Sequence, residues 1–249
     1  MESLLYSFLA GVSTVLGAVM IMVFGKPGPR LLSAFLGFAA GVMLAISFFD
    51  LMPEALGNGS IVTAAVGFLV GAGIMYALDR LIPHAHISAD QELALERTPH
   101  GRTGSKELLR IGYLVFFGLA LHNVPEGLAI GAGMEARPEL GLYVAIAIAL
   151  HNIPEGIAAA GILRAGGLSA VRVLLLTLVI GLMTPLGALL GLAFFRISPL
   201  FIAAGMAFAA GAMVYIASDE LIPQANKLNS HVSIGGLIVG LLVVFIMTA

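Results

Sequence analysis

Six residues at 122–127, His-Asn-Val-Pro-Glu-Gly, recur at 151–156 as His-Asn-Ile-Pro-Glu-Gly. Both copies lie inside long apolar runs. Because helical residues four apart share a face, each copy presents its histidine and its glutamate together. Ionisable side chains are costly in the hydrocarbon of a bilayer, so inside a span they mark a functional site by default. Two such helices running antiparallel would offer two imidazoles and two carboxylates to one point, which is a ligand set for a divalent metal of the zinc or iron type.

The composition of the chain is that of a membrane protein. Its 249 residues are 59% hydrophobic and 10% charged, with a mean hydropathy of +1.04, which is foreign to soluble domains. A helix needs about 20 apolar residues to cross a bilayer. Eight such runs are present, at roughly 4–24, 31–52, 61–82, 108–131, 140–163, 170–192, 199–221 and 232–248. We therefore expect one all-α polytopic transmembrane domain over 1–249, with eight spans.

The lysines and arginines predict the orientation of these spans. If the N-terminus lies outside, ten of the twelve face the cytoplasm and only Arg137 and Arg196 face outward, as the positive-inside rule favours. Both termini then lie outside, because the number of spans is even. The longest loop, about 83–107, is cytoplasmic. Its histidines belong either to a plain solvated loop or to a metal relay; they are His84, His86 and His100.

The chain also resembles itself at long range. The segment 38–55 aligns without gaps on 208–225, and the same offset of 170 places 14–18 on 184–188. Spans 1–3 thus match spans 6–8, while spans 4 and 5 match each other through the doubled motif. Matching spans would cross the membrane in opposite directions, so the pattern predicts a 3+2+3 inverted repeat. Secondary transporters with this plan place their site near the midplane.

The doubled motif contains a proline and an asparagine with structural consequences. Pro125 and Pro154 each remove a backbone N–H, so we expect a kink and a freed carbonyl in both helices. Asn123 and Asn152 lie nearer to the glutamates than to the histidines around each helix. They either form a second ion position that shares these glutamates or hydrogen-bond to neighbouring helices. The spacing leaves both interpretations open.

These residues resemble those of the Zrt/Irt-like (ZIP) metal transporters, and in particular the short bacterial zinc-uptake branch. The resemblance covers nearly the whole chain. It is carried by the doubled motif, by Gly-x-x-x-Pro-Leu-Gly-Ala at 181–188 and by Asp-Glu-Leu-Ile-Pro at 219–223. It implies an elevator-like movement of spans 1, 4, 5 and 6 against spans 2, 3, 7 and 8, in a homodimer.

The resemblance further implies two metal positions. The first would be formed by His122, Glu126, His151 and Glu155, with Met43 as a weak fifth ligand. The second would be formed by Asn123, Glu126, Asn152 and Glu155. Relatives complete the second position with a glutamate in span 6, whereas this chain has Thr184 there. A neutral hydroxyl is a poor substitute for that carboxylate, so we expect one strong position and a weak or missing second one.

Acidic residues at the ends of spans would form an entrance and an exit for cations, again by resemblance. The entrance residues are Asp50 and Glu54, on the outer side. The exit residues are Asp79, Asp219 and Glu220, followed by His231, on the inner side. Carboxylates at both mouths would raise the local cation concentration. The alternative for each of them is simple solvation of a helix end.

The sequence therefore predicts an importer of Zn²⁺ into the cytoplasm, set in a prokaryotic plasma (inner) membrane and using no organic cofactor. Fe²⁺, Mn²⁺, Co²⁺ and Cd²⁺ are further candidate cargoes, and the lipid bilayer is the surrounding partner; nothing points to nucleic acid. An intramembrane metallohydrolase would carry His-Glu-x-x-His, but an asparagine stands in place of that glutamate, so we do not expect an enzyme. A passive cation channel built on the same site is the alternative that sequence cannot separate from a carrier.

Overall fold

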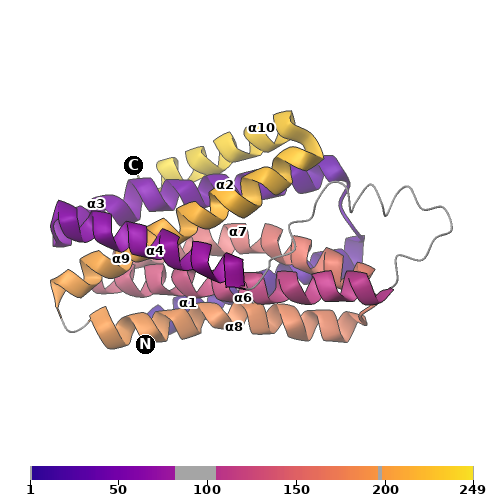
Figure 1. Cartoon of the computed structure of the whole chain (residues 1–249), viewed down its shortest axis with the longest axis horizontal. Helices are drawn as coiled ribbons and strands as arrows, with labels where there is room; N and C mark the ends of the chain where they lie inside the picture. The colour runs from indigo at the N-terminus through magenta and orange to yellow at the C-terminus, as the bar shows by residue number, and fades with distance from the viewer. Residues whose placement is uncertain (1, 82–104, 196–197, 249) are drawn as a thin grey trace.

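A computed structural model describes residues 2–81, 105–195 and 198–248, and every element within them is helical (Figure 1). Two of the elements are π-helical turns, η1 and η2. In chain order the elements are α1 (Glu2–Phe24), α2 (Pro29–Ala45), η1 (Ile46–Leu51), α3 (Met52–Asn58), α4 (Ile61–Leu81), α6 (Ser105–Ala136), α7 (Pro138–Ala165), α8 (Ala170–Phe195), α9 (Pro199–Ile216), η2 (Ala217–Leu221) and α10 (Ile222–Thr248).

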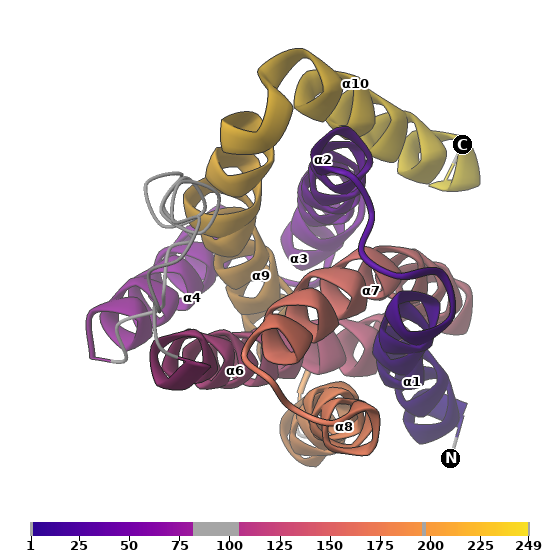
Figure 2. The same cartoon turned by 90° about the vertical axis from the view of Figure 1, so that its right-hand side faces the viewer.

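Seven helical segments of the described chain are long and apolar enough to cross a membrane. The predicted all-helical membrane class is thereby confirmed. Six of these segments correspond one for one to the first six apolar runs of the sequence. The seventh, Pro199–Thr248, is 50 residues long and contains the last two runs. It is not straight, because Asn229 has a non-helical backbone (φ −168°, ψ 104°) and α10 turns sharply there (Figure 2).

Helices α6 and α7, which carry the doubled motif, pack side by side in the middle of the bundle (Figure 2). On one side α1 packs on α7 and α8 packs on α6, and α1 also contacts α8. On the other side α2 contacts α7 and α9 contacts α6. Outside these, α10 pairs with α2 and α4 pairs with α9. The motif helices are therefore enclosed on both sides.

Glycines set the close packing of α1, α6, α7 and α8, which we call the site body. A β-carbon on Gly156 would overlap the backbone carbonyl of Thr14, and one on Gly127 would overlap that of Thr184. Because glycine lacks this atom, α1 approaches α7, and α8 approaches α6, to backbone contact. These four helices therefore form one closely packed group.

We call the remaining elements the flanking body; they are α2, η1, α3, α4, α9, η2 and α10. Glycines bring its helices close together in the same way. Gly41 lies against the carbonyl of Leu237 in α10, and Gly211 lies against that of Phe68 in α4. Between the two bodies, a continuous apolar cluster joins α2 and α9 to α6 and α7. It is built largely from alanine, methionine and isoleucine side chains, among them Ala40, Met43, Ala129, Ile130, Ala145, Ile148 and Met213.

The two π-helical turns occupy equivalent places. The turn η1 is followed by Pro53 and contains Asp50, while η2 is followed by Pro223 and contains Asp219 and Glu220. Such turns widen the helix by one residue and often occur at functional sites. Both turns contain acidic residues that the sequence analysis predicted at the entrance or the exit.

Two glycines of α7 test this packing. Replacing Gly156 by Ala places a methyl group on the Thr14 carbonyl, and overpacking of this kind costs about 1–3 kcal/mol. We expect the melting temperature of the protein in detergent to fall by about 3–10 °C. The matched control is Gly161→Ala, because no atom lies within 4 Å of the added carbon and alanine favours a helix. Equal melting temperatures for the two variants would contradict the packing described.

Candidate metal centre

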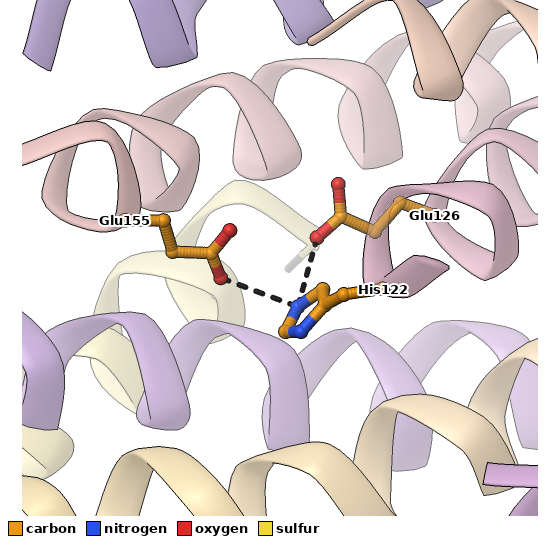
Figure 3. Close-up of side chains that lie close together, drawn as sticks. All are labelled: His122, Glu126 and Glu155. Carbon is orange, nitrogen blue, oxygen red and sulfur yellow. Dashed lines mark ion pairs between the residues drawn. The ribbon is translucent and has the colours of Figure 1, made fainter. Parts of the chain in front are cut away.

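The motif helices bring their ionisable side chains to one buried place. His122 and Glu126 project from α6, and His151 and Glu155 project from α7. Each of the four side chains is at most 1% exposed. Figure 3 shows the carboxylates of Glu126 and Glu155 turned toward the same ring nitrogen of His122. The doubled motif therefore makes one cluster rather than two separate ones.

The contacting atoms are the Nε2 nitrogen of each histidine and the Oε1 oxygen of each glutamate. Glu126 Oε1 lies 2.8 Å from His151 Nε2 and 3.3 Å from His122 Nε2. Glu155 Oε1 lies 3.3 Å from His122 Nε2 and 4.0 Å from His151 Nε2. Ligand atoms of His122, Glu126 and Glu155 all lie within 4.8 Å of one another. Ligands of one zinc ion stand about 2.0–2.2 Å from it, so the spacing of these three ligand atoms is compatible with one shared ion.

The two histidines are held differently. The Nδ1 atom of His151 lies 3.1 Å from the backbone carbonyl of Ala147, one turn earlier on α7. When Nδ1 donates this hydrogen bond, the ring is fixed and Nε2 is left as the atom that can act as a ligand. Nδ1 of His122 is buried and has no hydrogen-bond partner among the described residues. The ring of His151 is therefore the more firmly oriented of the two.

The asparagines of the motif bond to neighbouring helices through their amide nitrogens. Asn123 Nδ2 donates to the carbonyl of Ile180 on α8 (3.0 Å), and Asn152 Nδ2 donates to that of Ala10 on α1 (3.1 Å). This is one of the two interpretations that the sequence left open. The amide oxygens of both side chains are buried and have no hydrogen-bond partner within the described chain, so they stay available as ligands.

Two buried threonines lie next to these bonds. Thr184 follows Ile180 by one turn of α8, and Thr14 follows Ala10 by one turn of α1. Both are 0% exposed, and neither hydroxyl has a hydrogen-bond partner in the described residues. The packing of α8 on α6 thus repeats that of α1 on α7. The hydroxyl oxygen of Thr184 carries no charge.

The other predicted site residues come from elements other than α6 and α7. Met43 is fully buried in α2, within the cluster that joins the two bodies, and its role as a ligand stays a prediction. Asp50 is 9% exposed. Glu54 on α3 forms an ion pair with Arg137, at 2.9 Å between Oε2 and Nη2. Arg137 thus interacts with both carboxylates predicted at the entrance.

At the predicted exit, the hydroxyl of Tyr215 donates to Asp79 Oδ2 at 3.4 Å. Oδ2 of Asp219 is buried and has no hydrogen-bond partner among the described residues. Glu220 is partly exposed in η2, and His231 is exposed on α10. The loop histidines at 84, 86 and 100 lie outside the described residues.

Sequence reasoning missed Arg137 and Tyr215. Arg137 entered the sequence analysis only as one of two outward-facing charges. The signal was a lone arginine in the turn between the two motif helices. A positive charge next to a predicted cation entrance indicates that an acidic partner lies nearby. For Tyr215 the signal was weaker: the internal alignment places it opposite Ala45, so the repeat itself gives no hint of a polar contact there.

Known proteins are similar to this chain over nearly its whole length. The sequence model of the ZIP zinc transporter family matches residues 1–108 and 84–248. The zinc transporter ZupT of Corynebacterium aurimucosum is 38% identical over 257 residues, which cover 97% of this chain and 94% of that protein. ZupT of Escherichia coli O127:H6 is 38% identical over 256 residues, which cover 99% and 97%.

The chain therefore belongs to the ZIP zinc transporter family. It is an integral membrane protein, and the family resemblance drawn from its motifs is confirmed. Since members of this family are transporters, the expectation that the chain is not an enzyme is confirmed as well.

Proposed function

We propose that this protein is a carrier that moves Zn²⁺ into the cytoplasm across a bacterial plasma (inner) membrane. The ion would bind to His122, Glu126, His151 and Glu155. The observation that carries the proposal is the convergence of Nε2 and Oε1 atoms from α6 and α7, all buried, at separations of 2.8–4.0 Å. The ZupT relatives, whose name gives zinc as their substrate, support the choice of ion.

The chemistry of the cluster suits a transported divalent ion. Two carboxylates balance the charge of one M²⁺ ion, which lowers the cost of placing it in a buried site. Imidazole suits zinc and iron, and carboxylate also accepts manganese, so Fe²⁺, Mn²⁺, Co²⁺ and Cd²⁺ are proposed as secondary cargoes. The chain has no cysteine, and the absence of thiolate ligands keeps binding weak enough for release.

The proposal includes one transmembrane domain over 1–249 with eight crossings. A straight helix of 50 residues would be roughly 75 Å long, far more than the roughly 30 Å of hydrocarbon in a bilayer. The bend at Asn229 divides Pro199–Thr248 into two parts that can each cross once. Both chain termini lie toward the same end of the bundle (Figure 1), as eight crossings require. Inward transport, with both ends outside, rests on the distribution of Lys and Arg.

The 3+2+3 inverted repeat is supported by contacts that recur at the sequence offset of 170. Asn152 bonds to Ala10 and Asn123 to Ile180. Likewise, Gly156 packs on the carbonyl of Thr14 and Gly127 on that of Thr184. The two π-helical turns η1 and η2 are related in the same way. In this scheme α1 packs on α7 in the same way as α8 packs on α6.

A carrier is favoured over a channel because the cluster is closed to solvent. All four side chains are at most 1% exposed, so no open path through the described residues reaches them in this conformation. The site body and the flanking body are each locked by glycine contacts, whereas alanine-rich side chains fill the interface between them. Such an interface suits the elevator-like movement that the resemblance implies. The homodimer that it also implies stays an expectation, to be measured by mass photometry in detergent.

The four-residue site is tested by removing one carboxylate. In proteoliposomes, Glu126→Ala or Glu155→Ala should reduce ⁶⁵Zn²⁺ uptake by more than about tenfold, because each loses a ligand and half of the compensating charge. Glu139→Ala is the matched control, since Glu139 is an exposed acidic residue in the first turn of α7. Near-normal uptake by either site variant, with the protein folded, would refute the assignment.

Thr184 should limit a second ion. Two cations a few ångströms apart repel strongly unless carboxylates lie between them, and Thr184 contributes a neutral hydroxyl on the α8 side. We expect one tightly bound Zn²⁺ per wild-type chain and additional or tighter binding in Thr184→Glu, with slower release. Elemental analysis and competition titration measure both proteins. Two equally tight ions in the wild type, with no gain in the variant, would show that Thr184 is not limiting.

A further inference from the structure

An ion pair at one end of the molecule joins the site body to the flanking body. Arg137 lies in the turn between α6 and α7 and begins α7 with an extended backbone (φ −150°, ψ 122°). Its Nη2 and Nε atoms lie 2.9 and 3.1 Å from Oε2 of Glu54 on α3. The guanidinium belongs to the body that carries the cluster, and the carboxylate belongs to the other body.

Glu54 is held in place for this contact. Its second oxygen, Oε1, accepts a hydrogen bond from Asn58 Nδ2 at 3.0 Å, and its side chain is 19% exposed. Asp50, one turn earlier on the same segment, also interacts with the charge of Arg137. Arg137 itself is 62% exposed. An exposed guanidinium thus pairs with the held carboxylate of Glu54 at the predicted entrance.

The turn that carries Arg137 joins the two motif helices directly. A β-carbon on Gly133 would lie 3.0 Å from Cα of Gly141, and one on Gly141 would overlap the side chain of Met134. The last turn of α6 and the first turn of α7 are therefore packed backbone to backbone. A displacement of α6 and α7 relative to α3 by more than the reach of the Arg137 side chain would separate it from Glu54.

We propose that the Arg137–Glu54 ion pair is an external latch on the site body. It holds the α6–α7 turn against α3 while the four metal-site residues are closed to solvent, and it opens when the site exchanges metal with the outside. This inference rests on the proposed transport function. A divalent cation drawn to Asp50 and Glu54 competes with the guanidinium for the same oxygens, so its arrival weakens the latch. Arg137 is a positioning residue, because it acts through the movement of α6 and α7.

Loss of the latch should change the apparent affinity for external metal. The closed fraction of molecules does not bind from outside, so raising the open fraction lowers the half-saturating concentration. Because exposed ion pairs are weak, we expect Arg137→Gln to lower it about two- to fivefold. Arg137→Lys, which keeps the charge, should retain part of the wild-type value. Arg172→Gln is the control, since Arg172 is exposed at the start of α8.

A reversible cross-link separates a latch from a mere charge effect. The chain has no cysteine, so Glu54→Cys with Arg137→Cys introduces the only two thiols. A short bifunctional methanethiosulfonate should bridge them, as a mass shift would show. We expect Zn²⁺ uptake into proteoliposomes to stop on bridging and to return on reduction, whereas the reagent leaves uptake by each single variant intact. Failure to form the bridge, or undiminished uptake by the bridged protein, would overturn the latch.

Two further comparisons complete the test. If the wild type itself moves no Zn²⁺, the proposed function is wrong; if it does and the bridged protein does too, only the latch is wrong. If the double-cysteine protein takes up little Zn²⁺ before bridging, exchanging the two charges provides the test instead. Glu54→Arg with Arg137→Glu should restore the half-saturating concentration that Arg137→Glu alone lowers. A double variant no better than the single one would contradict the latch.

Discussion

Glu126 Oε1 lies 2.8 Å from His151 Nε2 and 3.3 Å from His122 Nε2, and each of these side chains is at most 1% exposed. A buried charge costs several kcal/mol unless other charges and hydrogen bonds compensate it. The surrounding structure therefore has to hold both histidines and both glutamates together at short range. Helices α6 and α7 do so because each carries a histidine and a glutamate four residues apart, facing the other helix.

The helices behind this cluster complete the arrangement. Asn123 and Asn152 each donate a hydrogen bond to a backbone carbonyl of the helix packed behind, on α8 and α1 respectively, which ties α6 to α8 and α7 to α1. Glycines at the end of each motif let the backing helices approach to backbone contact. The result is a rigid unit around the cluster, next to a second unit that it meets through small apolar side chains. This arrangement is what the proposed elevator-like movement would require.

The sequence predicted this centre because its information is local and repeated. His122 and Glu126 share a helix face by spacing alone, and the second copy supplies the other half of the set. Contacts between distant segments were not predictable in this way. The partners of the asparagines lie 57 and 142 residues away, and Glu54 lies 83 residues from Arg137. The bend at Asn229 falls between the last two apolar runs, 199–221 and 232–248, where the sequence predicted a break, but its position had no sequence signal because neither proline nor glycine stands there.

X-ray absorption at the zinc K-edge, on purified protein loaded with one equivalent of Zn²⁺, tests the centre most directly. Two imidazoles and two carboxylates should give a first shell of nitrogen and oxygen at about 2.0–2.2 Å, with the outer scattering of two imidazole rings. A sulfur contribution at longer distance would add Met43 to the set. Replacing His122 and His151 by Ala should remove the imidazole signal. A spectrum of oxygen ligands alone, unchanged by these substitutions, would contradict a metal site at the doubled motif.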